Sequence, residues 1–284
     1  MAQKIELVAS YWTFACGATP HGDHEYSTYS FRDRVAAAAK YGFTGFGVWH
    51  SDLEHVLKTS TLKELNLILK DHGMTHIEVE FLGDWWFTEG PQKEACDVRK
   101  RLLMDTASEL GAHHIKVGDF FNTACPMPQL ISAFASLCKE AEEHGTDILF
   151  ELMPFANIHT LEGALELVQG ADAKNGGIII DLWHMVKMGV PYSAIAAIPP
   201  RFLGGIEIND GTFTAPWSMV EDTVNHRRLC GEGEFDVMGF VKTMLDAGYK
   251  GPWGIEVLNE DMRSWPLERA AEAAARTTFA QFPA

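Results

Sequence analysis

Residues 177–184 have the sequence GIIIDLWH, in which a short apolar run ends in Asp181 and His184 follows three positions later. A run of this length and composition is typical of one strand buried on both faces of a parallel sheet. An isolated charge is costly inside such a strand, so we expect Asp181 at its carboxyl end, facing a positive group. The stretch therefore predicts a buried parallel strand that ends in a carboxylate.

Three further apolar runs end in the same way. Glu151 closes the run at 148–151, Glu207 lies in GIEIND at 205–210, and Glu256 lies in WGIEV at 253–257. Side chains alternate along a strand, so Glu207 and Asn209 share one face. If the four strands lie parallel in one barrel, their carboxylates converge at one end of it.

The whole chain alternates predicted strands with predicted helices. The expected strands cover residues 5–11, 43–49, 75–81, 114–117, 147–152, 177–181, 202–208 and 253–258, and the expected helices cover 29–41, 61–72, 92–110, 127–144, 161–169, 192–197, 235–247 and 266–279. This rhythm predicts an α/β fold, a (β/α)₈ TIM barrel that forms a single domain over residues 1–284. A doubly wound open sheet is the alternative, but no glycine-rich nucleotide-binding loop follows residues 5–11.

Composition excludes several classes of partner. The formal net charge at pH 7 is −16 and no basic cluster is present, so neither nucleic acid nor an anionic membrane is an expected partner. No apolar run approaches membrane-spanning length and no secretory signal is visible, which predicts a cytoplasmic protein. The five cysteines are scattered without paired spacing, which indicates reduced thiols and argues against a zinc–cysteine site.

Carboxylates that point inward from four strands repel one another unless a cation neutralises them. A divalent ion is the simplest solution, and four carboxylates without a cysteine favour Mn²⁺ or Mg²⁺ over zinc. The expected ligands are Glu151, Asp181, Glu207 and Glu256. Taken singly, each acid could equally be an ordinary loop charge or a helix cap, and His184 could be a hydrogen-bonded core histidine.

Several segments of the second half resemble the xylose isomerase-like barrel superfamily, the sugar phosphate isomerase/epimerase type of protein. These segments are ILFELMP at 148–154, IIIDLWHM at 178–185, GIEINDG at 205–211, RRLCGEGEFD at 227–236 and WGIEV at 253–257. The first half is similar to the family only in its strand–helix rhythm.

The resemblance implies roles for particular residues. The four strand-end acids would bind one divalent metal, with Mn²⁺ preferred and Mg²⁺ or Co²⁺ possible, and Glu151 and Glu256 would also form the catalytic acid/base pair. His184 and Arg227, or alternatively Arg228, would contact substrate oxygens. The chain departs from the family at Glu207, where His or Gln is usual, and at Cys230, where proline is usual.

A divalent ion that chelates adjacent hydroxyl and carbonyl oxygens makes the neighbouring carbon acidic and stabilises an enediolate. We therefore expect an isomerase or epimerase of a sugar, polyol or keto-sugar. The first alternative is a lyase on the same site, a dehydratase or eliminase of a keto-cyclitol, keto-acid or 3-keto-glycoside. The second is a non-catalytic barrel subunit of a complex. Product mass separates isomerisation from elimination, whereas a homo-oligomer and a heteromeric complex both remain open.

Residues at strand ends are candidates for substrate contact. Aromatic faces suit the C–H surfaces of sugars and cyclitols, which favours Trp12 and Trp183 among the aromatic residues that follow strand ends, although each of these could instead pack under a loop. His50, Glu80 and Lys116 follow or end strands of the first half, and we expect one of the three to reach the pocket. No phosphate cradle is visible near residues 205–234, so an unphosphorylated carbohydrate-like substrate is preferred.

Overall fold

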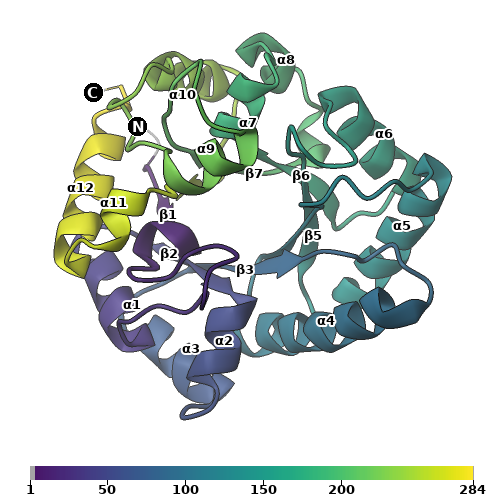
Figure 1. Ribbon diagram of the computed structural model, residues 1–284, viewed down its shortest axis with the longest axis horizontal. Coiled ribbons are helices and arrows are strands. Elements are labelled where there is room, and N and C mark those ends of the chain that lie inside the picture. The colour runs from purple at the N-terminus through teal and green to yellow at the C-terminus, as the bar shows by residue number, and fades with distance from the viewer. Residues whose placement is uncertain (1–3, 284) are drawn as a thin grey trace.

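Eight parallel strands pair in chain order, and β1 pairs with β8, so the sheet closes into a barrel (Figure 1). The computed structural model describes residues 4–283. The strands are β1 Leu7–Ala9, β2 Gly45–Trp49, β3 His76–Leu82, β4 His114–Val117, β5 Asp147–Glu151, β6 Gly176–Asp181, β7 Leu203–Ile208 and β8 Trp253–Ile255. The predicted fold class, a (β/α)₈ TIM barrel, is confirmed.

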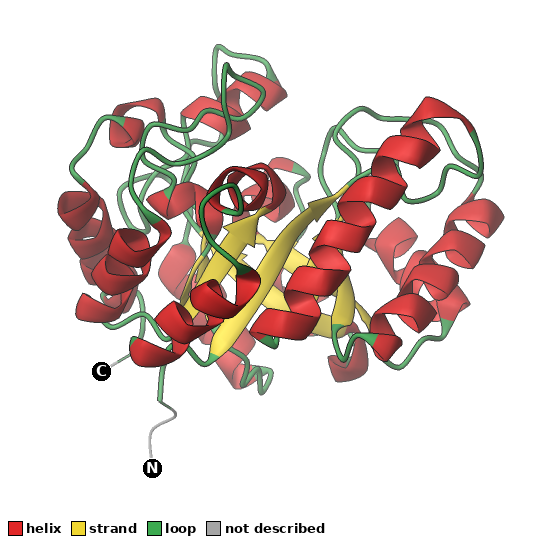
Figure 2. Ribbon diagram, turned by 90° about the horizontal axis from the view of Figure 1, so that it is seen from below, coloured by secondary structure: helices red, strands yellow, loops and turns green. Residues whose placement is uncertain are grey.

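Helices surround the strands, as Figure 2 shows from the side. They are α1 Phe31–Lys40, α2 His50–Val56, α3 Leu62–Asp71, α4 Gly90–Leu110, α5 Met127–Glu143, α6 Leu161–Ala171, α7 Leu182–Lys187, α8 Tyr192–Ala196, α9 Met219–Asn225, α10 Val237–Asp246, α11 Glu260–Arg263 and α12 Leu267–Phe279, with 3₁₀ turns at Tyr11–Phe14 and Pro200–Phe202. Among residues 4–283, no helix combines the length and apolarity needed to cross a bilayer.

The eight predicted helices are all present, and glycines end several of them. Gly111 follows α4 with φ of 66°, and Gly145 follows the C-cap of α5 with φ of 69°. Both values lie in the left-handed region that glycine adopts without steric cost, so each glycine stops its helix there.

Short elements after strand ends were not predicted. The strand expected at 5–11 ends at Ala9, and Tyr11–Phe14 form a 3₁₀ turn instead. Helices α2, α7, α9 and α11 also add to the predicted pattern. Helix α7 begins directly after β6 because the Asp181 carboxylate accepts a hydrogen bond from the Trp183 amide and caps the first turn.

The main apolar core lies between the strands and the surrounding helices, whereas the inside of the barrel also holds buried charged side chains. Lys116 on β4 reaches across the barrel to Glu207 on β7, and Ser10 lies within hydrogen-bond distance of the same carboxylate. Glycine makes room for this crossing, since a Cβ at Gly254 would stand 2.7 Å from Glu207 Cγ. The barrel thus brings charged side chains from distant strands into contact.

Candidate active site and metal centre

The four predicted metal ligands come together. Glu151 and Asp181 end β5 and β6, Glu207 lies in β7, and Glu256 follows β8 directly. One carboxylate oxygen from each lies within 4.8 Å of the others. All four side chains are buried, and Asp181 and Glu207 have no exposed surface. Such a set of oxygen donors fits a hard divalent cation.

Lys116 lies under this cluster. Its Nζ donates to Glu207 Oε1 and Oε2 at 2.8 and 2.9 Å and to Glu256 Oε1 at 3.2 Å. Glu80 Oε2 is 2.9 Å from the same nitrogen, and Glu151 Oε2 is 4.0 Å away. A fully buried ammonium therefore neutralises part of the carboxylate charge, and Glu207 is its nearest partner.

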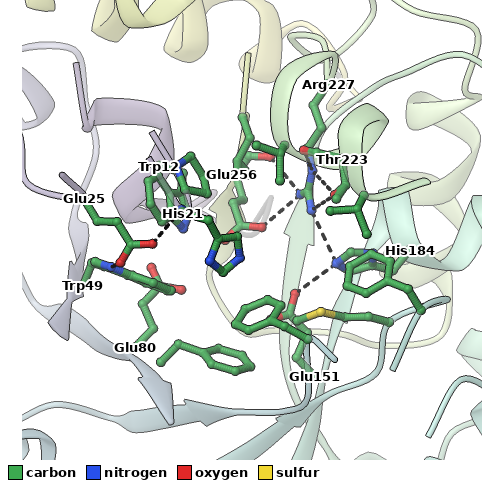
Figure 3. A pocket seen from close by; sticks show the side chains of 18 of the residues that line it. Trp12, His21, Glu25, Trp49, Glu80, Glu151, His184, Thr223, Arg227 and Glu256 are labelled. Atoms are coloured by element: carbon green, nitrogen blue, oxygen red, sulfur yellow. Dashed lines mark hydrogen bonds and ion pairs between the residues drawn. The ribbon is translucent and has the colours of Figure 1, made fainter. Parts of the chain in front are cut away.

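The Arg227 guanidinium supplies positive charge on a second side of the site, and His184 lies beside it (Figure 3). Arg227 Nη1 donates to Asp181 Oδ2 at 2.5 Å and to Glu256 Oε2 at 2.9 Å. His184 Nε2 lies 3.4 Å from Arg227 Nη2 and 3.5 Å from Glu151 Oε1. Asp181 thus faces a positive group, as predicted. Of the two arginine candidates, Arg227 enters the site, whereas Arg228 is exposed.

The environment separates the pKa values of the carboxyls. Burial raises the pKa of Glu80 and of Glu256 to about 7, with the Lys116 charge opposing it. Burial would also raise the pKa of Glu151, but the Lys116 charge and the hydrogen bond with His184 lower it below its usual value. Burial would raise the pKa of Asp181 as well, but the Arg227 charge and the hydrogen bond from Asn209, with other neighbours, together lower it below its usual value. Neighbouring carboxyls therefore favour different protonation states.

These shifts predict how the stability of the cation-free protein depends on pH. Because the pKa values of Glu80 and Glu256 are raised on folding, their stabilising contribution is complete below the unfolded value of 4.5 and is lost as pH rises through about 7. These two carboxyls should therefore lower the melting temperature in chelator as pH rises from about 5 to about 8, whereas the buried histidines His50 and His76, whose pKa values burial lowers to about 3, act in the opposite sense below about pH 6.5. The lowered pKa values of Glu151 and Asp181 give stability that is lost only at more acidic pH.

The matched variant for this pH prediction is Glu80→Gln, which removes one of the titrating groups. Its melting temperature in chelator should fall less steeply over the same range. The same pH dependence in the parent protein and in Glu80→Gln would contradict the prediction.

A cavity of about 210 Å³ opens above the cluster. Glu80, Glu151, His184, Arg227 and Glu256 provide its polar surface, together with Glu25 and other polar side chains from the loops (Figure 3). The aromatic residues of its lining are Trp12, His21, Trp49, Phe81, Phe120, Phe121 and Phe155. The site therefore combines an ionic floor with largely apolar walls, which is the usual composition of a small-molecule pocket.

The structure distributes the predicted substrate contacts unequally. Trp12, Glu80, His184 and Arg227 line the cavity, and Lys116 lies beneath its floor. Lys116, His50 and Trp183 do not belong to this lining.

Trp183 is fully buried, with the Arg227 guanidinium 5.5 Å from its ring centroid. His50 lines a neighbouring cavity, and its Nδ1 lies 3.4 Å from the backbone nitrogen of Phe81, which donates to it. Both side chains thus contact residues that line the cavity but do not line it themselves.

Sequence reasoning missed residues that join the network from outside the strand-end pattern. Thr223 on α9 holds the Arg227 guanidinium, with its Oγ1 2.8 Å from Nη2. Asn209 Nδ2 donates to Asp181 Oδ1 at 2.9 Å. Ser10 follows β1 and lies 2.9 Å from Glu207 Oε1. The shared face of Asn209 and Glu207 was a usable signal, whereas Thr223 and Ser10 carry no motif.

The closed eight-stranded barrel and the acids at the ends of β5 to β8 define a class of TIM-barrel proteins with a carboxylate site. A sequence profile described as "Xylose isomerase-like TIM barrel" matches residues 35–280. The chain belongs to this family, as its second half indicated.

The individual relatives share little sequence identity with this chain. The chain is 26% identical over 245 residues to a 3-dehydroshikimate dehydratase of Pseudomonas aeruginosa, with 84% of this chain and 38% of that protein covered. It is 23% identical over 150 residues to an inosose isomerase of Bacillus subtilis, with 52% and 53% covered. The chain therefore spans well under half the length of the dehydratase. Both relatives are named as enzymes.

Solved structures agree on the fold. A crystal structure described as the IOLI protein with a bound zinc atom superposes with a TM-score of 0.84 at 17% identity, covering 98% of each chain. This likeness shows the fold. In this chain, the cluster of Glu151, Asp181, Glu207 and Glu256 is a candidate site for a divalent metal ion.

Proposed function

We propose that this chain is a metal-dependent isomerase or epimerase of a small, unphosphorylated carbohydrate-like substrate. The observation that carries the proposal is the pair of buried carboxylates, Glu151 and Glu256, on the floor of an aromatic-walled cavity. They extend from β5 and from the end of β8, on either side of the acids of β6 and β7. Two carboxylates so placed can remove a proton from a substrate carbon and return it at another position.

The other residues position the substrate. Glu151, Asp181, Glu207 and Glu256 would hold the metal, Mn²⁺ by preference, with Mg²⁺ or Co²⁺ as alternatives. When bound, a divalent ion polarises a substrate carbonyl and acidifies the adjacent C–H bond. The polar atoms of His184 and Arg227 at the cavity floor would donate hydrogen bonds to substrate oxygens.

The cavity also favours a class of substrate. Trp12, Trp49 and Phe81 present apolar surface to whatever enters, which suits the C–H faces of a ring. Among the described lining residues, Arg227 is the single Lys or Arg side chain, and Asp181 and Glu256 already neutralise it. The carboxylates of the site would repel a phosphate group, so an uncharged polyol or keto-sugar is preferred.

A lyase on the same site is the second candidate. The named activity of the Pseudomonas relative, a dehydratase matched over 84% of this chain, favours it. Dehydration begins with the same proton removal and differs in the expulsion of a hydroxyl group, for which the second carboxyl supplies a proton. The same residues therefore serve both reactions.

The test is a substrate screen with manganese-loaded protein in deuterated water. The panel contains an inosose, 3-dehydroshikimate and several ketohexoses with their phosphorylated counterparts. An isomeric product with deuterium next to the carbonyl supports the isomerase, and a product that has lost water supports the lyase. If no panel member reacts or exchanges, both enzyme proposals fail and the non-catalytic subunit is favoured.

A further inference from the structure

A second group of possible ligands lies at the opposite end of the barrel. His76 and Glu78 are two positions apart on β3, so their side chains share a face. His114 begins β4 and is the register partner of Glu78. Since Glu78 Oε1 is 3.0 Å from Ser10 Oγ inside the barrel, this face points inward. The three residues precede the strand ends that carry the candidate active site.

Their spacing fits a small metal ion. One ligand atom from each of His76, Glu78 and His114 lies within 4.8 Å of the others. His114 Nε2 and Glu78 Oε2 are 3.6 Å apart. In a tetrahedral zinc site with bonds of about 2.0–2.1 Å, neighbouring ligand atoms stand about 3.3–3.4 Å apart. If these two atoms moved slightly closer together, both could therefore bind the same zinc ion.

His114 gives independent support. Its side chain is 4% exposed, and within residues 4–283 its Nε2 has no hydrogen-bond partner. Buried polar atoms are nearly always paired, so an orphaned imidazole nitrogen that faces a carboxylate calls for a ligand.

Neighbouring side chains hold the three residues in place. Ser10 Oγ lies by Glu78 Oε1, which leaves Oε2 directed at His114. The exposed ring of His113 stacks on His76, with centroids 4.0 Å apart and planes inclined by 25°. Such outer contacts are what orient ligands in metal sites.

We propose that His76, Glu78 and His114 bind a second divalent ion, distinct from the one at Glu151, Asp181, Glu207 and Glu256. Two imidazole nitrogens and one carboxylate select a zinc-type ion, such as Zn²⁺ or Co²⁺, rather than Mg²⁺. The ion would tie β3 to β4 at the amino ends of the strands, away from the cavity. Its role is to stabilise the barrel, so the proposal stands independently of the proposed function.

The experiment isolates this site by disabling the other one. The chelator-stripped Asp181→Asn protein is titrated with Zn²⁺ and then with Co²⁺, and bound metal is measured by equilibrium dialysis with elemental analysis. We expect one ion per chain and a Co²⁺ visible spectrum of tetrahedral intensity. Adding His114→Gln should abolish both, whereas adding His159→Gln, at an exposed histidine on the β5–α6 loop, should leave both unchanged.

A second variant provides the test if the protein with His114→Gln does not fold. His76 is half-buried, so His76→Gln in the same background should fold and still lose the ion. Far-ultraviolet circular dichroism verifies the fold of each variant. The proposal is overturned if the Asp181→Asn protein binds no ion, or if His76→Gln binds zinc as the His159→Gln control does.

Discussion

The Glu151→Gln variant should fold normally and turn over the substrate identified by the screen about 10²–10⁴ times more slowly than the parent protein. The amide cannot accept a proton from carbon, and it also removes one negative charge from the candidate metal site. Glu151 is buried at the end of β5 and faces both the cavity and His184. The loss should therefore appear in kcat, measured alongside KM and metal content.

The control for this substitution is Glu162→Gln, which makes the same chemical change at an exposed position in the first turn of α6. It should retain the activity of the parent. If Glu151→Gln keeps more than about a tenth of the parental kcat, Glu151 is not the catalytic base, because general base catalysis contributes more than that.

The strand-end carboxylates could be predicted because their signal is local. Each apolar run is short enough to be a strand, and the acid that closes it must lie at an end. Barrel topology then brings Glu151, Asp181, Glu207 and Glu256 together without further information. The helices could be predicted for the same reason, since their glycine stops and apolar periodicity are read within one segment.

The position of Trp183 could not be predicted in this way. It follows a strand end, which suggested a place on the rim of the pocket. The Asp181 cap instead starts α7 at Leu182, and the indole then packs under Arg227. Lys116 shows a second limit. Its sequence position placed it near the pocket, but only the closed barrel brings its ammonium to Glu207, three strands away on β7.

Lys116→Met should lower the free energy of unfolding of the cation-free protein by about 3–5 kcal/mol near neutral pH. Six acidic side chains are buried inside the barrel, and among residues 4–283 the Lys and Arg side chains paired with them are Lys116 and Arg227. The six are Glu78, Glu80, Glu151, Asp181, Glu207 and Glu256. Removing the ammonium leaves Glu207 and Glu80 without their closest positive partner. Denaturant unfolding in chelator measures the change.

The same variant should respond more strongly to a divalent ion than the parent does. A cation held by Glu151, Asp181, Glu207 and Glu256 would supply the positive charge that Lys116 no longer provides, so saturating Mn²⁺ should recover a larger share of the stability. The parent protein gains less because Lys116 already neutralises Glu207. The difference between the two gains in stability measures how far the ammonium and the metal ion neutralise the same carboxylate charge.

Lys187→Met is the matched control, because the Lys187 side chain is 7% exposed and is also paired, with its Nζ 2.6 Å from Asp222 Oδ2. This pair lies outside the carboxylate cluster, so the control should lose stability in chelator but gain no more from Mn²⁺ than the parent. Equal gains in Lys116→Met and Lys187→Met would contradict the argument. Lys116 would then be a structural ion pair, and the charge of the metal site would have to be balanced by protons on Glu80, Glu207 and Glu256, whose pKa values burial raises.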